Sequence, residues 1–266
     1  VTIATATVTN AGTDGIAIID SASNVDITTV SVDTTGGDGI LLDTNTGTYN
    51  SASVTVANTT GDGIIAIDND AAIDMDVVSI DTTTGNGLVL ETNTVNGTYN
   101  AITVDIANTT LAGMVVDTNA GTVDVDTLTI EETLNQGLYI TSTTGDVTVA
   151  NTNVYNSAAG FAAVEIGETT AAVDLGVVDI STIAAEATGL DVYNTATLTI
   201  ADGTIATADA TAIDMFNTTI AGGVNLTSVS SDLADGEGII LEQVDGDAVT
   251  IATATVTNAG TDGIAI

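Results

Sequence analysis

Residues 25–46 read VDITTVSVDTTGGDGILLDTNT, and residues 73–94 repeat this pattern as IDMDVVSIDTTTGNGLVLETNT. In the same way, YNSASVTVANTTGDGI at 49–64 matches YNAITVDIANTTLAGM at 99–114. The matching stretches start 48 and 50 residues apart, so the chain is built from internal repeats. A fixed period of this kind is typical of solenoids, in which each repeat packs on its neighbours.

One dipeptide, a Gly followed by an apolar residue, marks a shorter period of one turn. Successive anchors are separated by 24, 24, 24, 26, 24, 23, 29, 23, 26 and 25 residues. These ten steps cover the offset between two identical stretches, VTIATATVTNAGTDGIAI at 1–18 and 249–266. We therefore expect one ten-turn unit over 1–248 and the first turn of the next identical unit over 249–266. The anchor positions are Gly15, Gly39, Gly63, Gly87, Gly113, Gly137, Gly160, Gly189, Ala212, Gly238 and Gly263.

Apolar and polar residues alternate within each turn, as they do in strands. In the second turn Val25 and Ile27 share one face, the phase shifts before Val30, and Ile40 begins a third segment after the Gly. Each turn should thus hold three short strands. We expect the corners after the third residue, around the Asn-Thr-Thr-Gly segment, and in the Asp-Thr-Asn-Thr segment.

Two other fold classes are excluded by the same pattern. Thr, Val, Ile, Asp, Asn and Gly are poor helix formers, and no 3.6-residue spacing persists. An antiparallel sandwich would not need like residues at 24-residue spacing, whereas stacked turns do. The sequence predicts an all-β, single-stranded parallel β-helix of about ten turns of 24–25 residues.

The Gly-Asp-Gly-Ile pattern at 37–40 and 61–64, with Asn-rich corners, resembles the parallel β-helix repeat of pectin-degrading enzymes, phage tailspikes and autotransporter passengers. This resemblance covers the whole chain and implies a right-handed coil. The absence of Lys and Arg, together with the tandem identity, is more similar to long repetitive microbial surface adhesins and fibre proteins.

Composition excludes several kinds of chemistry. The chain has 36 acids and no Lys, Arg, His, Cys, Pro or Trp. Nucleic acid binding needs cations, a catalytic triad needs His or Lys, and tetrahedral zinc usually needs His or Cys. The apolar residues occur in short alternating runs, so no transmembrane helix is expected.

Acids in stacked turns would repel, because neighbouring strands lie about 4.8 Å apart. Two columns avoid this by alternating acids with neutral residues, which gives the two-turn repeat a physical reason. The alternative is recent duplication without selection for charge. The columns are Thr2, Asp26, Asn50, Asp74, Asn100, Asp124, Thr148, Asp174, Thr199 and Asn225, and then Thr9, Asp33, Ala57, Asp81, Ala107, Glu131 and Tyr155.

Two further sets are expected to form uninterrupted acid ladders without basic partners. Ca²⁺ is the candidate ion for them, since it accepts carboxylate and carbonyl oxygens in flexible geometry. Solvated surface acids are the alternative. The metal-ligand candidates are Asp14, Asp38, Asp62, Glu237 and Asp262 before the anchor, and Asp20, Asp43, Asp68, Glu91, Asp117 and Glu242 after the apolar run.

Smaller features leave alternatives open. Tyr49 and Tyr99 occupy the first inward position of matching turns, as core residues or as sugar platforms. Asn10, Asn58, Asn108 and Asn156 should stack at one corner with hydrogen bonds along the axis. Five glycosylation sequons begin at Asn58, Asn96, Asn108, Asn217 and Asn225.

The function expected from these features is structural and not enzymatic: an extracellular or cell-surface fibre, stalk or adhesin shaft made of tandem units. Its partners would be copies of the same repeat stacked along the axis, with lateral contacts between rods through divalent cations. The alternatives are a polysaccharide-binding or carboxylate-dependent glycan-degrading β-helix and an ice-binding solenoid, for which Thr5, Thr29 and Ser53 begin a hydroxyl ladder.

Overall fold

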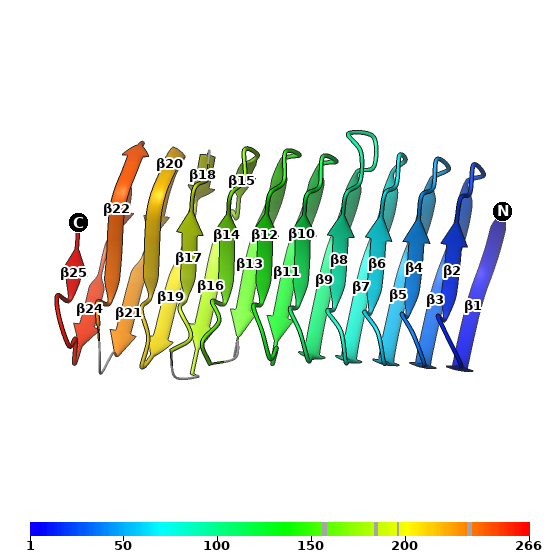
Figure 1. Ribbon diagram of the computed structural model, residues 1–266, viewed down its shortest axis with the longest axis horizontal. Coiled ribbons are helices and arrows are strands. Elements are labelled where there is room, and N and C mark those ends of the chain that lie inside the picture. Colours follow the sequence, from blue (N-terminus) through cyan, green and yellow to red (C-terminus); the bar gives the residue numbers. More distant parts are fainter. Residues whose placement is uncertain (156–158, 184–185, 196, 233–235) are drawn as a thin grey trace.

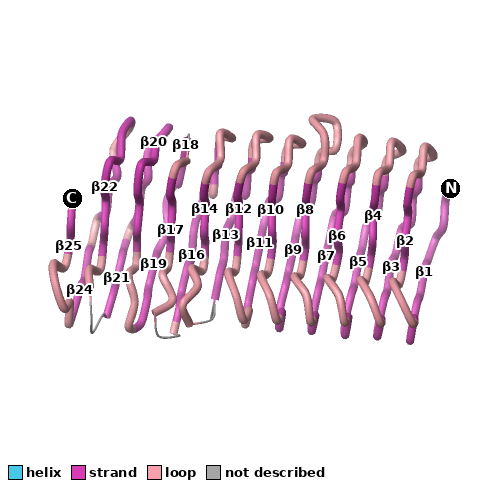
Figure 2. The backbone as a smooth tube through the Cα atoms, viewed as in Figure 1, coloured by secondary structure: helices cyan, strands magenta, loops and turns pink. Residues whose placement is uncertain are grey.

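The backbone winds into one elongated coil, with the N and C termini at opposite ends (Figure 1). This computed structural model describes residues 1–155, 159–183, 186–195, 197–232 and 236–266. The coil has about 11 turns of about 24 residues, and neighbouring turns are joined by parallel strand pairs. Strands and loops make up all the described residues, without a helix (Figure 2). The predicted parallel β-solenoid is confirmed.

Each of the first seven turns contributes one long and one short strand. The corner predicted after the third residue is a bend within the long strand, where the buried face changes and the register between turns is the same on both sides. The long strands are β1 (Thr2–Ala11), β3 (Val25–Thr35), β5 (Tyr49–Thr59), β7 (Ile73–Thr83), β9 (Tyr99–Thr109), β11 (Val123–Glu131) and β13 (Val147–Tyr155). The short strands are β2 (Ile16–Ile19), β4 (Ile40–Asp43), β6 (Ile64–Ile67), β8 (Leu88–Glu91), β10 (Met114–Asp117), β12 (Leu138–Thr141) and β14 (Val164–Gly167).

The later turns divide the same path differently. Gly176 has φ 55° and separates two strands at the corner that earlier turns bend smoothly. The strands are β15 (Ala172–Asp174), β16 (Val177–Thr182), β17 (Leu190–Tyr193), β18 (Thr197–Ile200), β19 (Asp202–Ala208), β20 (Ile213–Leu226), β21 (Ser228–Asp232), β22 (Ile239–Gly246), β23 (Val249–Ile251), β24 (Ala254–Thr257) and β25 (Ile264–Ala265).

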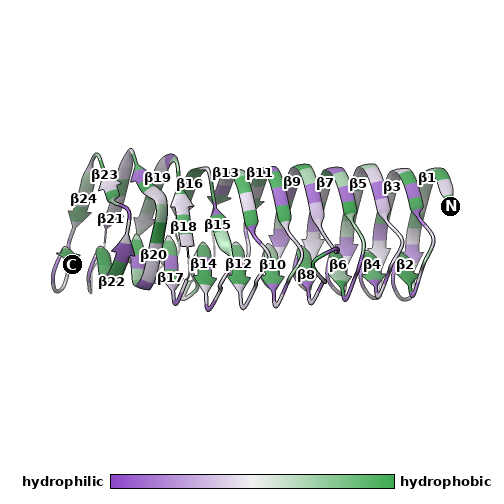
Figure 3. Ribbon diagram, turned by 90° about the horizontal axis from the view of Figure 1, so that it is seen from above, coloured by the Kyte–Doolittle hydropathy of each residue, from purple (hydrophilic) through white to green (hydrophobic). Residues whose placement is uncertain are grey.

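The interior is a continuous apolar column that runs along the axis. Val30, Val54 and Val78 are Cα partners in successive turns, and all three are buried. Apolar and polar residues alternate around the coil (Figure 3). Each inward side chain therefore packs on its own equivalent one turn away, as the repeat requires.

The anchor Gly is needed for space and not for an unusual φ. A Cβ on Gly63 would lie 2.5 Å from Ile80 Cγ2 and 2.6 Å from the carbonyl oxygen of Gly87. In the seventh turn the anchor prediction was wrong: Val164, not Phe161, is the partner of Leu138, so Ala163 holds the anchor position. Ala163 adds only one methyl group at this crowded position, whereas the Gly pattern selects Gly160, three residues too early.

A buried asparagine ladder, absent from the sequence expectations, fills one interior corner. The Asn45 amide Nδ2 donates to Asn69 Oδ1 (3.0 Å), and Asn69 Nδ2 donates to Asn93 Oδ1 (3.0 Å). The same nitrogens also donate to the carbonyl oxygens of Ile18 and Leu42, both at 2.9 Å. These bonds satisfy backbone groups at the corner that the strand ladder leaves without partners.

Tyr49 and Tyr99 are core residues, which confirms the first of the two alternatives for them. Both are buried, and neither hydroxyl has a hydrogen-bond partner. Burial raises the pKa of Tyr49 to about 12. Each hydroxyl thus loses its hydrogen bonds to water on folding and gains none within the protein.

We expect Tyr99→Phe to raise the free energy of unfolding by about 1 kcal/mol, because it removes an unsatisfied buried hydroxyl and keeps the ring. The denaturant midpoint measures this change. Tyr155→Phe is the control, since the Tyr155 hydroxyl is partly exposed and donates to Asp179 Oδ2 (3.1 Å). A loss of stability in Tyr99→Phe would contradict the prediction and indicate a water bound to that hydroxyl.

Candidate functional site

The acids before the anchor form a hydrogen-bonded column. Asp14 Oδ1 accepts the backbone N–H of Asp38 (2.9 Å), and Asp38 Oδ1 accepts that of Asp62 (2.8 Å). Asp62 Oδ1 in turn accepts the N–H of Asn86 (2.6 Å), whose own Oδ1 accepts from Ala112 (3.0 Å). Each carboxylate thus has a backbone partner in the following turn.

This bonding explains the Gly-Asp-Gly pattern. A Cβ on Gly37 would lie 2.3 Å from Asp14 Oδ1, and one on Gly61 would lie 2.2 Å from Asp38 Oδ1. The first Gly therefore leaves room for the carboxylate of the preceding turn, and the second leaves room for the core.

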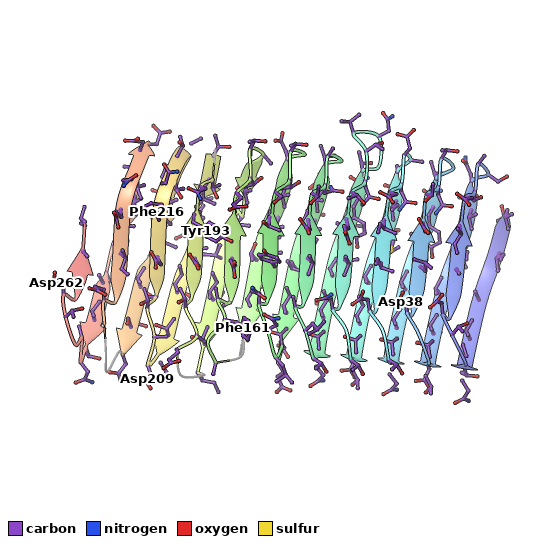
Figure 4. All side chains as sticks on the ribbon, in the orientation of Figure 1. Asp38, Phe161, Tyr193, Asp209, Phe216 and Asp262 are labelled. Carbon is purple, nitrogen blue, oxygen red and sulfur yellow. The ribbon has the colours of Figure 1, made fainter. Side chains whose placement is uncertain are left out.

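The column retains some repulsion between its carboxylates. Burial raises the pKa of Asp38, as do the charges of Asp62 and Asp14, while the bond from the Asp62 N–H opposes the shift. Figure 4 labels Asp38 and Asp262, which lie near opposite ends of the rod and hold the corresponding place in their turns. Glu237 also precedes an anchor Gly, so all five predicted members keep this position in the repeat.

The second predicted ladder is wrong as an uninterrupted column. Asp43 is the Cα partner of Ile19 and Ile67, so Asp20 and Asp68 stand one position further along the chain. The first three acids therefore alternate between two adjacent columns, because the apolar run before the acid is one residue longer in the first and third turns than in the second, fourth and fifth. Direct neighbours are Glu91 and Asp117; Glu242 pairs with Phe216.

These acids stabilise corners with left-handed backbone. Thr44 has φ 54° and Thr118 has φ 50°, which is unusual for a β-branched residue. The Thr44 hydroxyl donates to Asp43 Oδ1 (2.6 Å), and the Thr118 hydroxyl donates to Asp117 Oδ1 (2.8 Å). The Asp-Thr dipeptides are thus structural elements of the corner.

The predicted alternation of acids and neutral residues is confirmed by the register from Thr2 to Thr199; Asn225 is out of line with Thr199, because Ile200 pairs with Val224. Asn50 pairs with Asp26 and Asp74, and its amide donates to Asp26 Oδ1 (2.6 Å). At the other column Asn58 donates to Asp33 Oδ1 (2.7 Å), so the corner amides bond to acids and not to one another. Asn156, a predicted member of that corner, lies outside the described residues.

Three acids that sequence reasoning missed stack in consecutive turns. Glu165, Asp191 and Asp214 are successive Cα partners on β14, β17 and β20. The Tyr193 hydroxyl and the Gln136 amide donate to Glu165 at 3.1 and 2.7 Å. Tyr193 and Phe216 are Cα partners on neighbouring strands (Figure 4), each two residues after an acid of this cluster. Taking Gly160 as the anchor misaligns this turn by three residues. Taking Ala163 as the anchor aligns the three acids in one column.

The middle carboxyl of this cluster is hard to ionise. Burial, followed by the charges of Asp214 and Glu165, raises the pKa of Asp191 from 3.8 to about 6. The folded state then binds a proton that the unfolded chain releases between pH 4 and pH 6. Stability from this group is present at acidic pH and is lost as the pH rises through about 6.

We therefore expect Asp191→Asn to raise the free energy of unfolding at pH 7 by about 1 kcal/mol, allowing for solvent screening, and to change it little at pH 4. Denaturant titrations at the two pH values measure the difference. Asp70→Asn removes the same charge at an exposed acid whose pKa the Thr94 hydroxyl and the Asn96 amide lower. Equal stabilisation by both substitutions would show a general charge effect and contradict the assignment to Asp191.

The predicted calcium sites find no geometric support. In the described part of the chain, no three acids converge on a point where one ion could bind them together. The Asp14–Asp38–Asp62 acids have backbone partners, and the second set is split between two columns. Calcium binding stays a prediction that these observations do not favour.

We expect Ca²⁺ and Mg²⁺ at matched ionic strength to raise Tm equally, because both would only screen the net charge of −36. Thermal melting with each chloride, and with NaCl as the control, measures this. A larger shift with Ca²⁺ alone, reversed by a chelator, would contradict the expectation and restore the calcium prediction.

Open grooves follow two corners of the rod. One is lined by Asp26, Asn50, Asp74 and Asp76, and it continues past Asn100 to Asp124 and Asp126. Another is lined by Ser79, Asp81, Asp105, Thr129 and Glu131. Neither lining contains an aromatic side chain on which a sugar ring could stack. On an outward face, Thr5, Thr29 and Ser53 are in register, and Val77 interrupts that hydroxyl ladder in the next turn.

Comparison with protein families, with curated proteins and with solved structures finds no match to this chain. Among the described residues no helix is long and apolar enough to span a membrane.

Proposed function

We propose that this chain is a structural repeat of an extracellular or cell-surface fibre, stalk or adhesin shaft. In this proposal, units of 248 residues continue one acidic rod, each adding about ten turns and roughly 50 Å of length. Catalysis is not part of the proposal, because the acids before the anchor bond to backbone groups, the Asp-Thr acids stabilise corners, and the acid-lined grooves are open to solvent along the rod.

The observation that carries this proposal is the packing of the repeated stretch at both ends. Residues 249–266 stack on the tenth turn, where Val249 pairs with Val224 and Ile264 pairs with Ile239. The identical residues 1–18 stack on the second turn, where Ile16 pairs with Ile40. One sequence is therefore compatible with the turn before it and with the turn after it, as a tandem array requires.

The charge pattern also supports continuation across the unit boundary. Asp232 pairs with Thr257, and Thr9, the equivalent of Thr257 in the first turn, pairs with Asp33. A tandem unit would thus place one neutral residue between two acids, which is the alternation found along the rest of the column.

Location outside the cell and lateral contact between rods belong to the same proposal. A chain without Lys or Arg offers no site to trypsin-like proteases, which favours an exposed location. The strong negative charge keeps rods apart or allows divalent cations to bridge them. The same charge disfavours nucleic acid as a partner.

A chain in which residues 1–248 precede a second full copy, 1–266, tests the tandem arrangement. We expect small-angle scattering and electron microscopy to show one straight rod, longer than the single chain by roughly 50 Å and unchanged in cross-section. A control with a flexible Gly-Ser linker at the junction should show two separate rods. If the chain without the linker also formed two rods joined at a variable angle, that result would contradict the proposal.

A further inference from the structure

The corner between β8 and β9 carries a loop that is two residues longer than the same corner in the next turn. Residues 92–98 read TNTVNGT, whereas the corresponding residues 118–122 read TNAGT. The additional residues are Val95, which is 72 % exposed, and Asn96, which is also exposed. The loop extends further out than the corners on either side of it (Figure 1). It therefore presents an Asn-Gly dipeptide, Asn96–Gly97, on the surface of the rod.

The longer loop changes the hydrogen bond of the glycine N–H. In the next turn the equivalent glycine, Gly121, donates to the carbonyl oxygen of Asn93, one turn back (3.3 Å). Gly97 instead donates to the carbonyl oxygen of Thr94 inside its own loop (2.9 Å). A movement of the loop alone can therefore release the Gly97 nitrogen, without the loss of a backbone bond between turns.

We propose that Asn96 is a site of spontaneous covalent modification, at which the Gly97 nitrogen converts the side-chain amide into a succinimide. Glycine favours this reaction because it has no Cβ to obstruct the approach and its backbone adopts many conformations. The proposal concerns the chemistry of this loop and does not depend on the structural role proposed above.

The reaction has two steps and needs only water as a co-reactant. The Gly97 nitrogen attacks Cγ of Asn96, a C–N bond forms and closes a five-membered ring, and the Cγ–Nδ2 bond breaks. The proton of the Gly97 nitrogen leaves with the amide NH₂ as ammonia. Water then adds to one of the two ring carbonyl carbons and breaks its bond to nitrogen, which gives either an aspartate or an isoaspartate at position 96.

The other Asn-Gly dipeptide of the sequence, Asn86–Gly87, is bonded to both neighbouring turns. Asn86 Nδ2 donates to Asp62 Oδ1 (3.1 Å), and Asn86 Oδ1 accepts the N–H of Ala112 (3.0 Å). The Gly87 N–H donates to the carbonyl oxygen of Ala112 (3.0 Å). Ring closure at Asn86 therefore requires the separation of stacked turns, and this dipeptide is an internal control for Asn96.

The modified residue would face a carboxylate of the preceding turn. Asn96 Nδ2 donates to Asp70 Oδ1 (3.0 Å), and the Thr94 hydroxyl donates to the same oxygen. An aspartate at position 96 replaces this donor by an acceptor of like charge, so the bond is lost and the two carboxylates repel. An isoaspartate also lengthens the backbone beside Gly97, where a Cβ would lie 2.2 Å from the carbonyl oxygen of Asn69. Either product should loosen the loop from the preceding turn.

Peptide mapping of the folded chain after incubation at mildly alkaline pH tests the site. Pepsin serves for digestion, since the chain has no Lys or Arg for trypsin and the reaction is slow at acidic pH. Mass spectrometry detects the replacement of NH₂ by OH. We expect position 96 to react at least about tenfold faster than position 86, which corresponds to a barrier lower by about 1.4 kcal/mol. In denaturant the two rates should become similar. Equal rates in the folded chain, or a faster reaction at position 86, would overturn the proposal.

Asn96→Gln is the matched control for the chemistry. It keeps an amide at this position, but its side chain would have to close a six-membered ring, so the mass gain in this peptide should be lost. Circular dichroism melting confirms that the variant folds. A mass gain that persists in the peptide of Asn96→Gln would overturn the assignment to this residue.

Asn96→Asp carries one of the two products directly and tests the consequence. We expect the N–H groups of Thr94 and Gly97 to lose protection from hydrogen exchange in this variant. In the Asp70→Asn background the same substitution should cause little loss, because the opposing carboxylate is absent. An equal loss of protection in both backgrounds would overturn the role of Asp70 as the group that the modification repels.

Discussion

Replacing Asn69 by Ala should lower the free energy of unfolding by about 3 kcal/mol, through loss of several buried hydrogen bonds at once. Asn69 is 1 % exposed. Its Nδ2 donates to the Leu42 carbonyl oxygen (2.9 Å) and to Asn93 Oδ1 (3.0 Å). Its Oδ1 accepts the backbone N–H of Asn45 (3.1 Å) and that residue's Nδ2 (3.0 Å). Alanine removes all four bonds, although Asn93 Oδ1 keeps the backbone N–H of residue 69 (2.9 Å) and Asn45 Nδ2 keeps the Ile18 carbonyl oxygen (2.9 Å).

Asn119→Thr is the matched control for that loss. Asn119 holds the same corner one turn beyond Asn93, but its Oδ1 has no partner and its Nδ2 donates within its own turn to Gly121 (2.6 Å). The next turn already carries Thr143 at this corner. We expect a loss below about 1 kcal/mol for this substitution, measured as a denaturant midpoint. Equal losses for both variants would contradict a special role for the ladder.

The coil could be predicted because stacked turns require like residues at a fixed spacing along the sequence. Inward residues pack on their own equivalents, so columns such as Val30, Val54 and Val78 are visible in the sequence. The alternation of Asp26, Asn50 and Asp74 was visible for the same reason. Period alone indicates neither hydrogen bonds nor small shifts of register.

Both errors arose where one position can be filled in two chemically similar ways. Ala163 satisfies the anchor because the site restricts volume and not φ, so the Gly signal was misleading there. Asp20 and Asp43 differ by one residue across a left-handed corner, and both look like the end of the same apolar run. Once Ala163 was missed, the stacked Glu165, Asp191 and Asp214 could not be aligned.

The asparagine ladder was hidden for a different reason. Asn45 and Asn58 both lie in Thr-rich corners, and composition does not tell which amide points inward. The structure buries Asn45 and leaves Asn58 exposed. Whether a corner side chain points inward or outward depends on the backbone conformation of two or three neighbouring residues, and the repeat does not reveal that conformation.

The anchor position provides the second large effect. We expect Gly87→Val to lower the free energy of unfolding by about 3 kcal/mol. A Cβ on Gly87 would lie 2.4 Å from Ile106 Cγ2 and 2.5 Å from the carbonyl oxygen of Gly113. The obstructing oxygen belongs to the backbone of the next turn, so a side-chain rotation cannot relieve the contact.

Gly12→Val separates this clash from the general effect of replacing glycine. A Cβ on Gly12 meets nothing within 4 Å, and its φ is not in the left-handed region, so we expect a change within about 0.5 kcal/mol.

Gly87→Ala should fall between the two, since Ala163 and Ala212 show that this column accepts one methyl group where the neighbouring turns adapt to it. Denaturant midpoints of the three variants should therefore rank Gly12→Val, Gly87→Ala and Gly87→Val in decreasing stability. If Gly87→Val were as stable as Gly12→Val, close approach of successive turns would not be the reason for glycine at the anchor. Because each turn contacts only its neighbours, hydrogen exchange should also show the loss concentrated in the turns around residue 87.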